Sequence, residues 1–201
     1  FLSVKVQSLD HLAERARFGT SSIRRAAQVL RVRPDLQIVP FRGNVGTRLQ
    51  KLLDGVADAT LLAMAGLNRL DEGHRATALL NAETFMPAPA QGAVGIAVRS
   101  GDARMAGIVA ALDHKPTHTA ITAERAMLAV LDGSCRTPVG ALSRLDAQTL
   151  VLKGQILSLD GKTAFDSAAA GTDPLRLGRQ VGEDLIAQAG TDWLAQWAAT
   201  P

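Results

Sequence analysis

The segment GTSSIRR (residues 19–25) places hydroxyl side chains at the start of an expected helix and two arginines in its first turn. The first turn of a helix exposes unpaired backbone N–H groups and the positive end of the helix dipole, so cations are disfavoured there. No carboxylate lies nearby in the sequence to offset the charges of Arg24 and Arg25. This pattern favours a bound anion at the turn. The alternative is that both arginines pair with acidic side chains from elsewhere in the fold.

The segment FRGNVGTRLQ (41–50) repeats this design one unit later in the chain. Asn44 can cap the following helix, and Arg42 and Arg48 lie on either side of Asn44 in the sequence. Both segments are expected at the carboxyl edge of one parallel sheet, where ligands of open α/β sheets bind. Two arginine-rich helix starts side by side predict a ligand with several acidic groups. The sequence holds neither the Walker phosphate-binding pattern nor a GxGxxG dinucleotide turn.

The chain has one cysteine, in the loop LDGSCRTPVG (131–140). The preceding Gly133 and Ser134 leave little bulk around the sulfur of Cys135, and the adjacent Arg136 favours a thiolate. Such a thiol could be a nucleophile or an attachment point, although a single cysteine is often an inert small hydrophobe. A lone cysteine also excludes an internal disulfide framework and suits a reducing compartment, so we expect a cytoplasmic protein.

Other kinds of chemistry find little support in the sequence. The four histidines include one close pair, His114 and His118, without a metal-binding motif around it, so we expect no metal site. Catalysis by a serine triad lacks a nucleophile elbow. Aromatic residues make up 3% of the chain, which argues against base stacking on nucleic acid. No apolar run reaches the roughly 18 residues that span a bilayer, so no membrane partner is expected. Of the 22 basic residues, 17 are arginine, which binds carboxylates through paired hydrogen bonds; a compositional bias toward arginine is the alternative explanation.

Strand-like and helix-like patterns alternate through the first half of the chain. After a strand that ends near residue 20, the expected elements are helix 21–33, strand 34–41, helix 44–55, strand 57–65, helix 66–80, strand 92–100 and helix 102–113. The first of these form two βαβ units and predict a parallel sheet.

The pattern changes near residue 114. The expected elements there are helix 117–131, strands 139–145, 150–160 and 163–171, and helix 173–189. Asp160-Gly161 predicts a type I′ hairpin between the last two strands. Asp173 is expected to cap the final helix, with Pro174 at its first position. These patterns predict a small α+β domain with an antiparallel three-stranded sheet, with the boundary before it near residues 100–114.

Several strings together resemble the porphobilinogen deaminase (hydroxymethylbilane synthase) family in order and spacing. They are GTSSIRR, RPDL, RGNVGTRL, LLAMAGLNRL, QGAVGIAVR, and TAERAMLAVLDGSC followed by PVG. The resemblance implies a transferase of heme biosynthesis that joins four porphobilinogen molecules into the linear tetrapyrrole hydroxymethylbilane, with release of ammonia. It also implies a dipyrromethane cofactor held by a thioether to a loop cysteine, here Cys135.

The resemblance also implies roles for individual residues. Cofactor contacts fall on Cys135, Thr20, Ser22, Arg24, Arg25, Arg42, Asn44, Gln91 and Gly92, and substrate contacts on Arg42, Arg48 and Arg69. Two residues depart from the family pattern, because Ser134 and Ala90 stand where the family usually has glycine.

The resemblance implies a periplasmic-binding-protein-like α/β domain with a parallel or mixed sheet, followed by the α+β domain. Residues 1–8 match the end of a first domain and its hinge, 9–91 a second domain, 92–113 a returning strand and helix, and 114–201 a C-terminal domain. The family's catalytic aspartate belongs to the part of the first domain that has no match here. We therefore expect a piece of a longer protein, inactive alone, monomeric, with porphobilinogen and the growing pyrrole chain as partners. The alternative is a non-catalytic binding module for an organic polyanion.

Overall fold

The computed structural model describes residues 1–133, 137–190 and 193 of the chain. Contacts divide the chain into two units that interleave in sequence. Unit 1 comprises Phe1–Met86, Gly133–Gly140 and Gln155–Phe165, and unit 2 comprises Pro87–Asp132, Ala141–Gly154 and Asp166–Pro201. The division into four segments at residues 8, 91 and 113 stays a prediction.

A four-stranded sheet forms the centre of unit 1. Its order is β1 (Leu2–Ser3), β4 (Ala59–Thr60), β2 (Arg17–Gly19) and β3 (Gln37–Val39). Strand β2 runs parallel to both β3 and β4, whereas β1 pairs with β4 antiparallel. The carboxyl ends of β2, β3 and β4 therefore share one edge, and the segments after β2 and β3 are the two arginine-rich turns. This mixed sheet confirms the predicted fold class of the first part of the chain.

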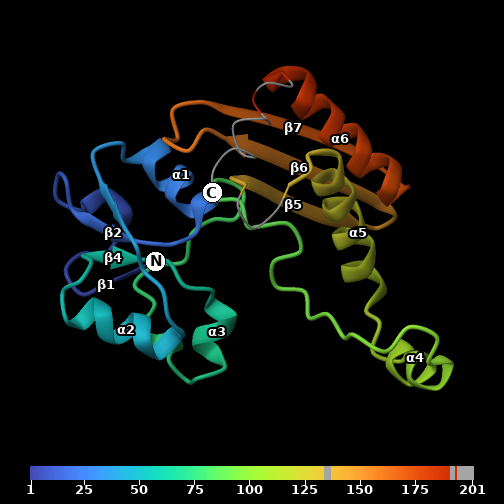
Figure 1. The fold of residues 1–201 in the computed structure, drawn as a ribbon, viewed down its shortest axis with the longest axis horizontal. Coiled ribbons are helices and arrows are strands. Elements are labelled where there is room, and N and C mark those ends of the chain that lie inside the picture. The colour runs from blue at the N-terminus through green and yellow to red at the C-terminus, as the bar shows by residue number, and fades with distance from the viewer. Residues whose placement is uncertain (134–136, 191–192, 194–201) are drawn as a thin grey trace. The chain divides into compact units, whose positions relative to one another are not determined.

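Helices α1 (Ile23–Val32) and α2 (Val45–Leu53) follow the two turns. Each helix buries its apolar side in a separate cluster. The α1 cluster contains Phe1, Leu9, Leu12, Phe18, Val29, Leu36, Ala59 and Leu61. The α2 cluster contains Leu2, Phe41, Leu49, Leu52, Ala57 and Leu67. Because side chains alternate along an extended chain, Phe1 and the adjacent Leu2 of β1 belong to different clusters. In Figure 1, strands β1, β2 and β4 lie between the two helices.

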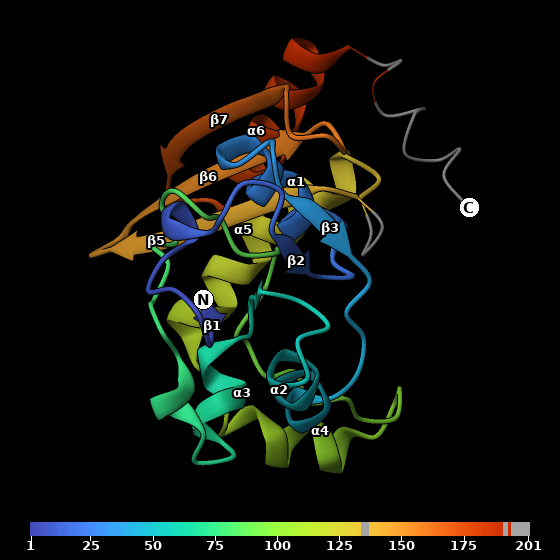
Figure 2. The ribbon, with the colours of Figure 1, turned by 90° about the vertical axis from the view of Figure 1, so that its left-hand side faces the viewer.

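The second sheet contains β5 (Val139–Asp146), β6 (Thr149–Leu157) and β7 (Ala164–Gly171) in sequential order, as Figure 2 shows. It is the predicted antiparallel sheet. Helices α5 (Lys115–Val130) and α6 (Pro174–Ala189) pack together closely. A Cβ on Gly178 of α6 would come within 2.3 Å of the Ala123 carbonyl oxygen of α5. Asp173 caps α6 as predicted, accepting hydrogen bonds from the backbone N–H groups of Leu175 and Arg176.

Two predicted elements are wrong. In place of a helix over 66–80, α3 (Met64–Asn68) ends early, and a 3₁₀ turn follows at Gly73–Arg75. Asp71 is left-handed (φ 58°), and this backbone geometry breaks the helical hydrogen-bond series. The segment 93–99 has no ladder partner among the described residues and forms no strand before α4 (Ala103–Ala110) (Figure 1). A short 3₁₀ turn, η1, spans Leu9–His11.

The hairpin between β6 and β7 forms at the predicted place, but its turn is not type I′. The backbone N–H of Ser158 donates to the carbonyl of Thr163 (2.9 Å), which closes a four-residue loop. Type I′ requires positive φ at two successive residues, and in this loop only Gly161 is left-handed (φ 72°). The left-handed glycine also allows a close approach, because a Cβ there would lie 2.4 Å from the Ala27 carbonyl oxygen of α1.

Candidate anion-binding site

The turn after β2 is held by its own hydroxyl groups. The backbone N–H of Thr20 donates to the carbonyl of Val39 (3.0 Å), which continues the pairing with β3. The Thr20 hydroxyl accepts from the backbone N–H of Ser22 (3.1 Å). The Ser22 hydroxyl in turn caps α1 by accepting from the backbone N–H of Arg25 (3.4 Å). Both predicted cofactor-contacting hydroxyls therefore shape the backbone from which α1 begins.

The turn after β3 is connected to the first turn and capped independently. The Ser21 hydroxyl accepts from the backbone N–H of Phe41 (3.0 Å), which joins the two turns at one sheet edge. The side-chain oxygen of Asn44 accepts from the backbone N–H of Thr47 (2.8 Å) and from its hydroxyl (2.9 Å). Asn44 is therefore the N-cap of α2, as predicted from its place before the helical pattern.

Arg24 is buried in unit 1, with 6% of its surface exposed. Its Nη1 donates to the side-chain oxygen of Gln28 (2.9 Å) and to the carbonyl oxygen of Met86. The Gln28 side chain donates to the same carbonyl (3.0 Å). Burial, and then the charge of Arg25, lowers the pKa of Arg24 to about 10, which still leaves it charged at neutral pH. These contacts fix the end of the segment that leaves unit 1 at Met86.

Arg25 and Arg48 complete a set of three neighbouring cations, which we call the guanidinium cluster (Arg24, Arg25 and Arg48). Arg25 donates from Nη1 to the carbonyl of Leu61 (2.8 Å), directly after β4. Burial, and then the positive charge of Arg48, lowers the pKa of Arg25. Arg48 extends from α2, and its Nε is buried without a hydrogen-bond partner in the structure. The cluster thus joins cations from both turns at the carboxyl edge of the sheet.

The cluster has the properties of a site for a polyanion. Among the described residues, neither Arg25 nor Arg48 forms an ion pair with an acidic side chain. Like charges held together in a partly buried place repel one another, and a buried N–H without an acceptor is destabilising. Carboxylates of a ligand would relieve both effects, because guanidinium groups bind carboxylates through charge-assisted hydrogen bonds. The chemistry of these donors therefore fits a ligand with several carboxylates.

The remaining predicted site residues are exposed or lie outside the described residues. Arg42 and Arg69 have exposed side chains, at the start of the second turn and at the end of α3. Gln91 and Gly92 are exposed and belong to unit 2. Cys135 lies outside the described residues, so its predicted role is not tested by the structure.

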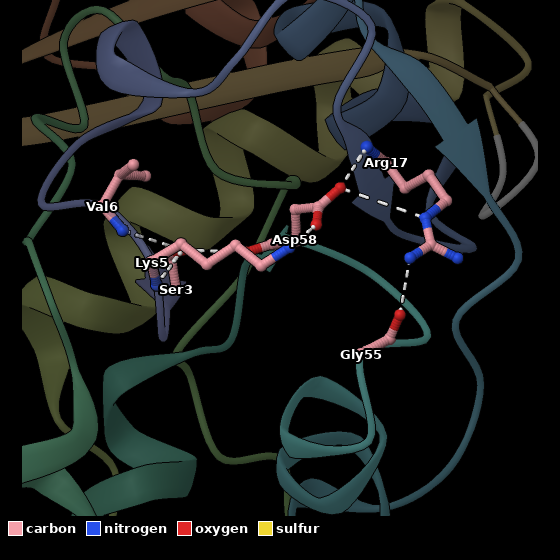
Figure 3. Close-up of polar contacts among 6 residues, drawn as sticks. All are labelled: Ser3, Lys5, Val6, Arg17, Gly55 and Asp58. Atoms are coloured by element: carbon pink, nitrogen blue, oxygen red, sulfur yellow. Dashed lines mark hydrogen bonds and ion pairs between the residues drawn. The ribbon is translucent and has the colours of Figure 1, made fainter.

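Two contacts in this region could not be expected from the sequence. The first is the hydrogen bond from Arg24 to the Met86 carbonyl, whereas the pairing of Arg24 with Gln28 had a signal in their four-residue spacing on one helix face. The second feature is a clamp around Asp58, shown in Figure 3. Its carboxylate accepts from Lys5 Nζ (2.5 Å) and from the backbone N–H of Arg17 (2.7 Å), and these contacts lower its pKa, with the Lys5 hydrogen bond the largest cause.

The Asp58 clamp also holds the chain that precedes β2. The Ser3 hydroxyl donates to the Asp58 carbonyl (2.8 Å) and accepts from the backbone N–H groups of Lys5 and Val6, as Figure 3 shows. The carboxylate is therefore occupied by partners at the start of β4, away from the carboxyl edge of the sheet where the guanidinium cluster lies.

Comparison with known proteins shows which family the chain resembles. Residues 1–107 match the family model described as porphobilinogen deaminase, dipyromethane cofactor binding domain, and residues 118–187 match the model of the porphobilinogen deaminase C-terminal domain. These matches take in most of the chain. The chain therefore belongs to the porphobilinogen deaminase family.

Individual relatives agree with the family models. A porphobilinogen deaminase of Nitrobacter hamburgensis is 44% identical over 98% of this chain and 63% of its own length. A chloroplastic porphobilinogen deaminase of Pisum sativum is 43% identical over 94% of this chain and 53% of its own length. The chain thus spans somewhat under two thirds of these relatives.

None of the helices among the described residues is long and apolar enough to cross a bilayer. Within the same residues, no three histidine, cysteine or acidic side chains gather as a metal site would require.

Proposed function

We propose that this chain is the cofactor-bearing part of a porphobilinogen deaminase, which condenses four porphobilinogen molecules into hydroxymethylbilane with release of ammonia. The observation that supports this proposal most strongly is the guanidinium cluster with the partnerless Nε of Arg48. Porphobilinogen carries an acetate and a propionate, so a chain of pyrroles is a polycarboxylate. A set of arginines at the carboxyl ends of parallel strands suits such a ligand.

In this proposal the dipyrromethane cofactor is attached to Cys135 through a thioether. Its carboxylates bind to Arg24, Arg25 and Arg42, with Thr20, Ser22, Asn44, Gln91 and Gly92 beside it. Arg48 and Arg69, with Arg42, bind the carboxylates of the incoming substrate. Each charge-assisted hydrogen bond would contribute roughly 1.5–3 kcal/mol.

The described part of the chain contains groups that can bind and orient a polycarboxylate, but its Asp58 is not available as a proton donor. Each condensation needs a group that manages protons as ammonia leaves and the carbon–carbon bond forms. Asp58 sits among Lys5 and Arg17 and is not free for this task. We therefore propose that the acid belongs to the part of the relatives' length that this chain does not match. The chain alone should bind polycarboxylates without sustained turnover.

A non-catalytic binding module for an organic polyanion is the second candidate. The same guanidinium cluster supports it, because binding alone would satisfy Arg48. The covalent cofactor separates the two candidates, since a binding module needs no thioether on Cys135. A cytoplasmic location and a monomeric state accompany the first candidate as further proposals.

The test uses the chain joined to the N-terminal third of the Nitrobacter hamburgensis relative. We expect this chimera to consume porphobilinogen and to carry extra mass on Cys135, with the colour that Ehrlich's reagent gives with dipyrromethane. The Cys135→Ser chimera is the matched control, with unmodified mass and no turnover expected. A folded wild-type chimera that binds porphobilinogen but acquires no covalent mass would contradict the enzyme and favour the binding module.

A further inference from the structure

Helix α5 contains a buried carboxylate that the proposed chemistry does not use. Glu124 is 8% exposed and lies beside the fully buried Ala123. Its Oε2 accepts a hydrogen bond from the backbone N–H of Ala90 (2.6 Å). Its Oε1 accepts from both the backbone N–H (3.0 Å) and the hydroxyl (2.6 Å) of Ser143 on β5. Burial of a carboxylate is costly unless hydrogen bonds compensate it, and here three donors do so.

The partner of Oε2 lies in a strained turn. The backbone N–H of Gln91 donates to the carbonyl of Ala88 (2.9 Å), which closes a four-residue turn with Pro89 at its second position. Ala90, at the third position, has φ 60°. This geometry belongs to the type II turn, which requires a left-handed third residue and therefore prefers glycine there. Alanine in that conformation persists only where the surroundings enforce it.

The turn is fastened on both sides within unit 2. At its start, the carbonyl of Pro87 accepts from the backbone N–H of Ala141 on β5 (3.0 Å). At its end, the Ala90 N–H is held by Glu124, and the Ala90 carbonyl accepts from the backbone N–H of Ala93 (3.2 Å). The Glu124 carboxylate therefore joins α5, β5 and the turn through one side chain.

We propose that Glu124 is a positioning residue that enforces the left-handed turn at Ala90 and thereby sets the place of Gln91 and Gly92. This inference rests on the proposed function, in which those two residues border the cofactor. Glu124 does not touch the ligand in this scheme, and its effect passes through the backbone of the turn.

A carboxylate is required at this position because every partner of Glu124 is a donor. In Glu124→Gln, the side-chain amide keeps one acceptor oxygen and gains an NH₂ group. If the oxygen faces Ala90, the NH₂ faces the backbone N–H of Ser143, and the reverse orientation places it against the N–H of Ala90. One buried donor remains unpaired either way. Ser143→Ala is the matched control, because it removes the hydroxyl donor but leaves both backbone donors of Glu124 in place.

The first experiment measures amide hydrogen exchange in the 201-residue chain by NMR. In Glu124→Gln we expect the amides of residues 90, 91 and 93 to exchange about 10-fold faster or more, the factor that ~1.4 kcal/mol gives. In Ser143→Ala these amides should change by less than about threefold relative to the rest of α5 and β5. Glycine adopts the left-handed turn without enforcement, so Ala90→Gly should restore slow exchange when combined with Glu124→Gln.

The two single variants and the Ala90→Gly combination distinguish a positioning role of Glu124 from a purely structural one. Equal acceleration in both single variants, or no rescue by Ala90→Gly, would show that Glu124 only stabilises unit 2 and would overturn the proposal. The functional arm repeats the variants in the chimera, where Glu124→Gln should lower the rate of cofactor assembly and Ala90→Gly should restore it. Unchanged assembly despite a loosened turn would overturn the link to the cofactor. A wild-type chimera without cofactor would count against the proposed function, while hydrogen exchange would still decide the role of Glu124.

Discussion

Replacing Arg48 by methionine should stabilise the ligand-free chain and weaken its binding of porphobilinogen. The Nε of Arg48 is buried without an acceptor, and its charge is close enough to lower the pKa of Arg25. Methionine retains most of the apolar length of the arginine side chain and removes both the unpaired donor and the charge. Most substitutions of half-buried residues destabilise a protein, so a gain in stability would be diagnostic of a ligand-binding arginine.

The expected gain in the free energy of unfolding comes from removing an unpaired buried donor and a repulsive positive charge. A buried donor without a partner costs about 1–3 kcal/mol. Lost contacts of the guanidinium group with its surroundings offset part of this gain. We therefore expect Arg48→Met to raise the free energy of unfolding by roughly 1 kcal/mol. Salt screens repulsion between cations, so the difference from wild type should shrink in about 0.5 M NaCl.

The matched control is Arg24→Met, because Arg24 is a neighbouring cation with protein partners. Its loss removes the charged donor to the Met86 carbonyl and to Gln28, so we expect a loss of about 2 kcal/mol. Urea unfolding measures both changes through the shift of the midpoint at constant slope. Porphobilinogen should then raise the midpoint of wild type more than that of Arg48→Met, because a ligand stabilises only the state that binds it.

The reasoning would be refuted by the opposite pattern. If Arg48→Met lost more than about 1 kcal/mol while its response to porphobilinogen stayed equal to that of wild type, Arg48 would be a structural residue. Its buried Nε would then have a partner in solution.

Other predictions follow from single contacts. Lys5 holds the pKa of Asp58 below its usual value, so the stabilisation by this carboxylate is present above about pH 4 and is lost as the pH falls through the lowered pKa. Asp58→Asn should therefore lower the urea midpoint near neutral pH, with the difference vanishing in acid. Gly161→Ala should lower the free energy of unfolding by more than about 2 kcal/mol, because the added Cβ would meet the backbone of α1. Gly55 is also left-handed but has open space around it, so Gly55→Ala should lower the free energy of unfolding by about 1 kcal/mol. Thermal unfolding measures both changes. Gly178→Ala should lower the melting temperature by several degrees, because it forces α5 and α6 apart.

Features that depend on neighbouring residues could be predicted from the sequence. Asn44 caps α2 and Asp173 caps α6 because the acceptor and the N–H donors lie within three residues of each other. The gathering of cations from two turns at one edge also followed from local patterns, since consecutive parallel strands place their carboxyl ends together.

Features that depend on distant partners could not be predicted. The pattern over 92–100 is suitable for a strand, but a strand also needs a neighbour to pair with, and no described residue pairs with it. The early end of α3 depends on one left-handed residue, Asp71, which propensities do not reveal. Arg24 was predicted as a ligand residue from its place in the first turn, yet one of its partners is Met86, 62 residues further along the chain.

In the two turns, the groups that hold the backbone differ from the groups that would bind the ligand. Their side-chain oxygens are engaged with nearby N–H groups, as Ser21, Ser22 and Asn44 show. These bonds exist without a ligand and keep the helix starts in place, so binding need not order them again. Arg48 has no such internal engagement at its Nε. Because the backbone is already fixed and the charge is not yet compensated, a polycarboxylate would gain most of its binding free energy from the cations, and specificity would depend on how its carboxylates are spaced.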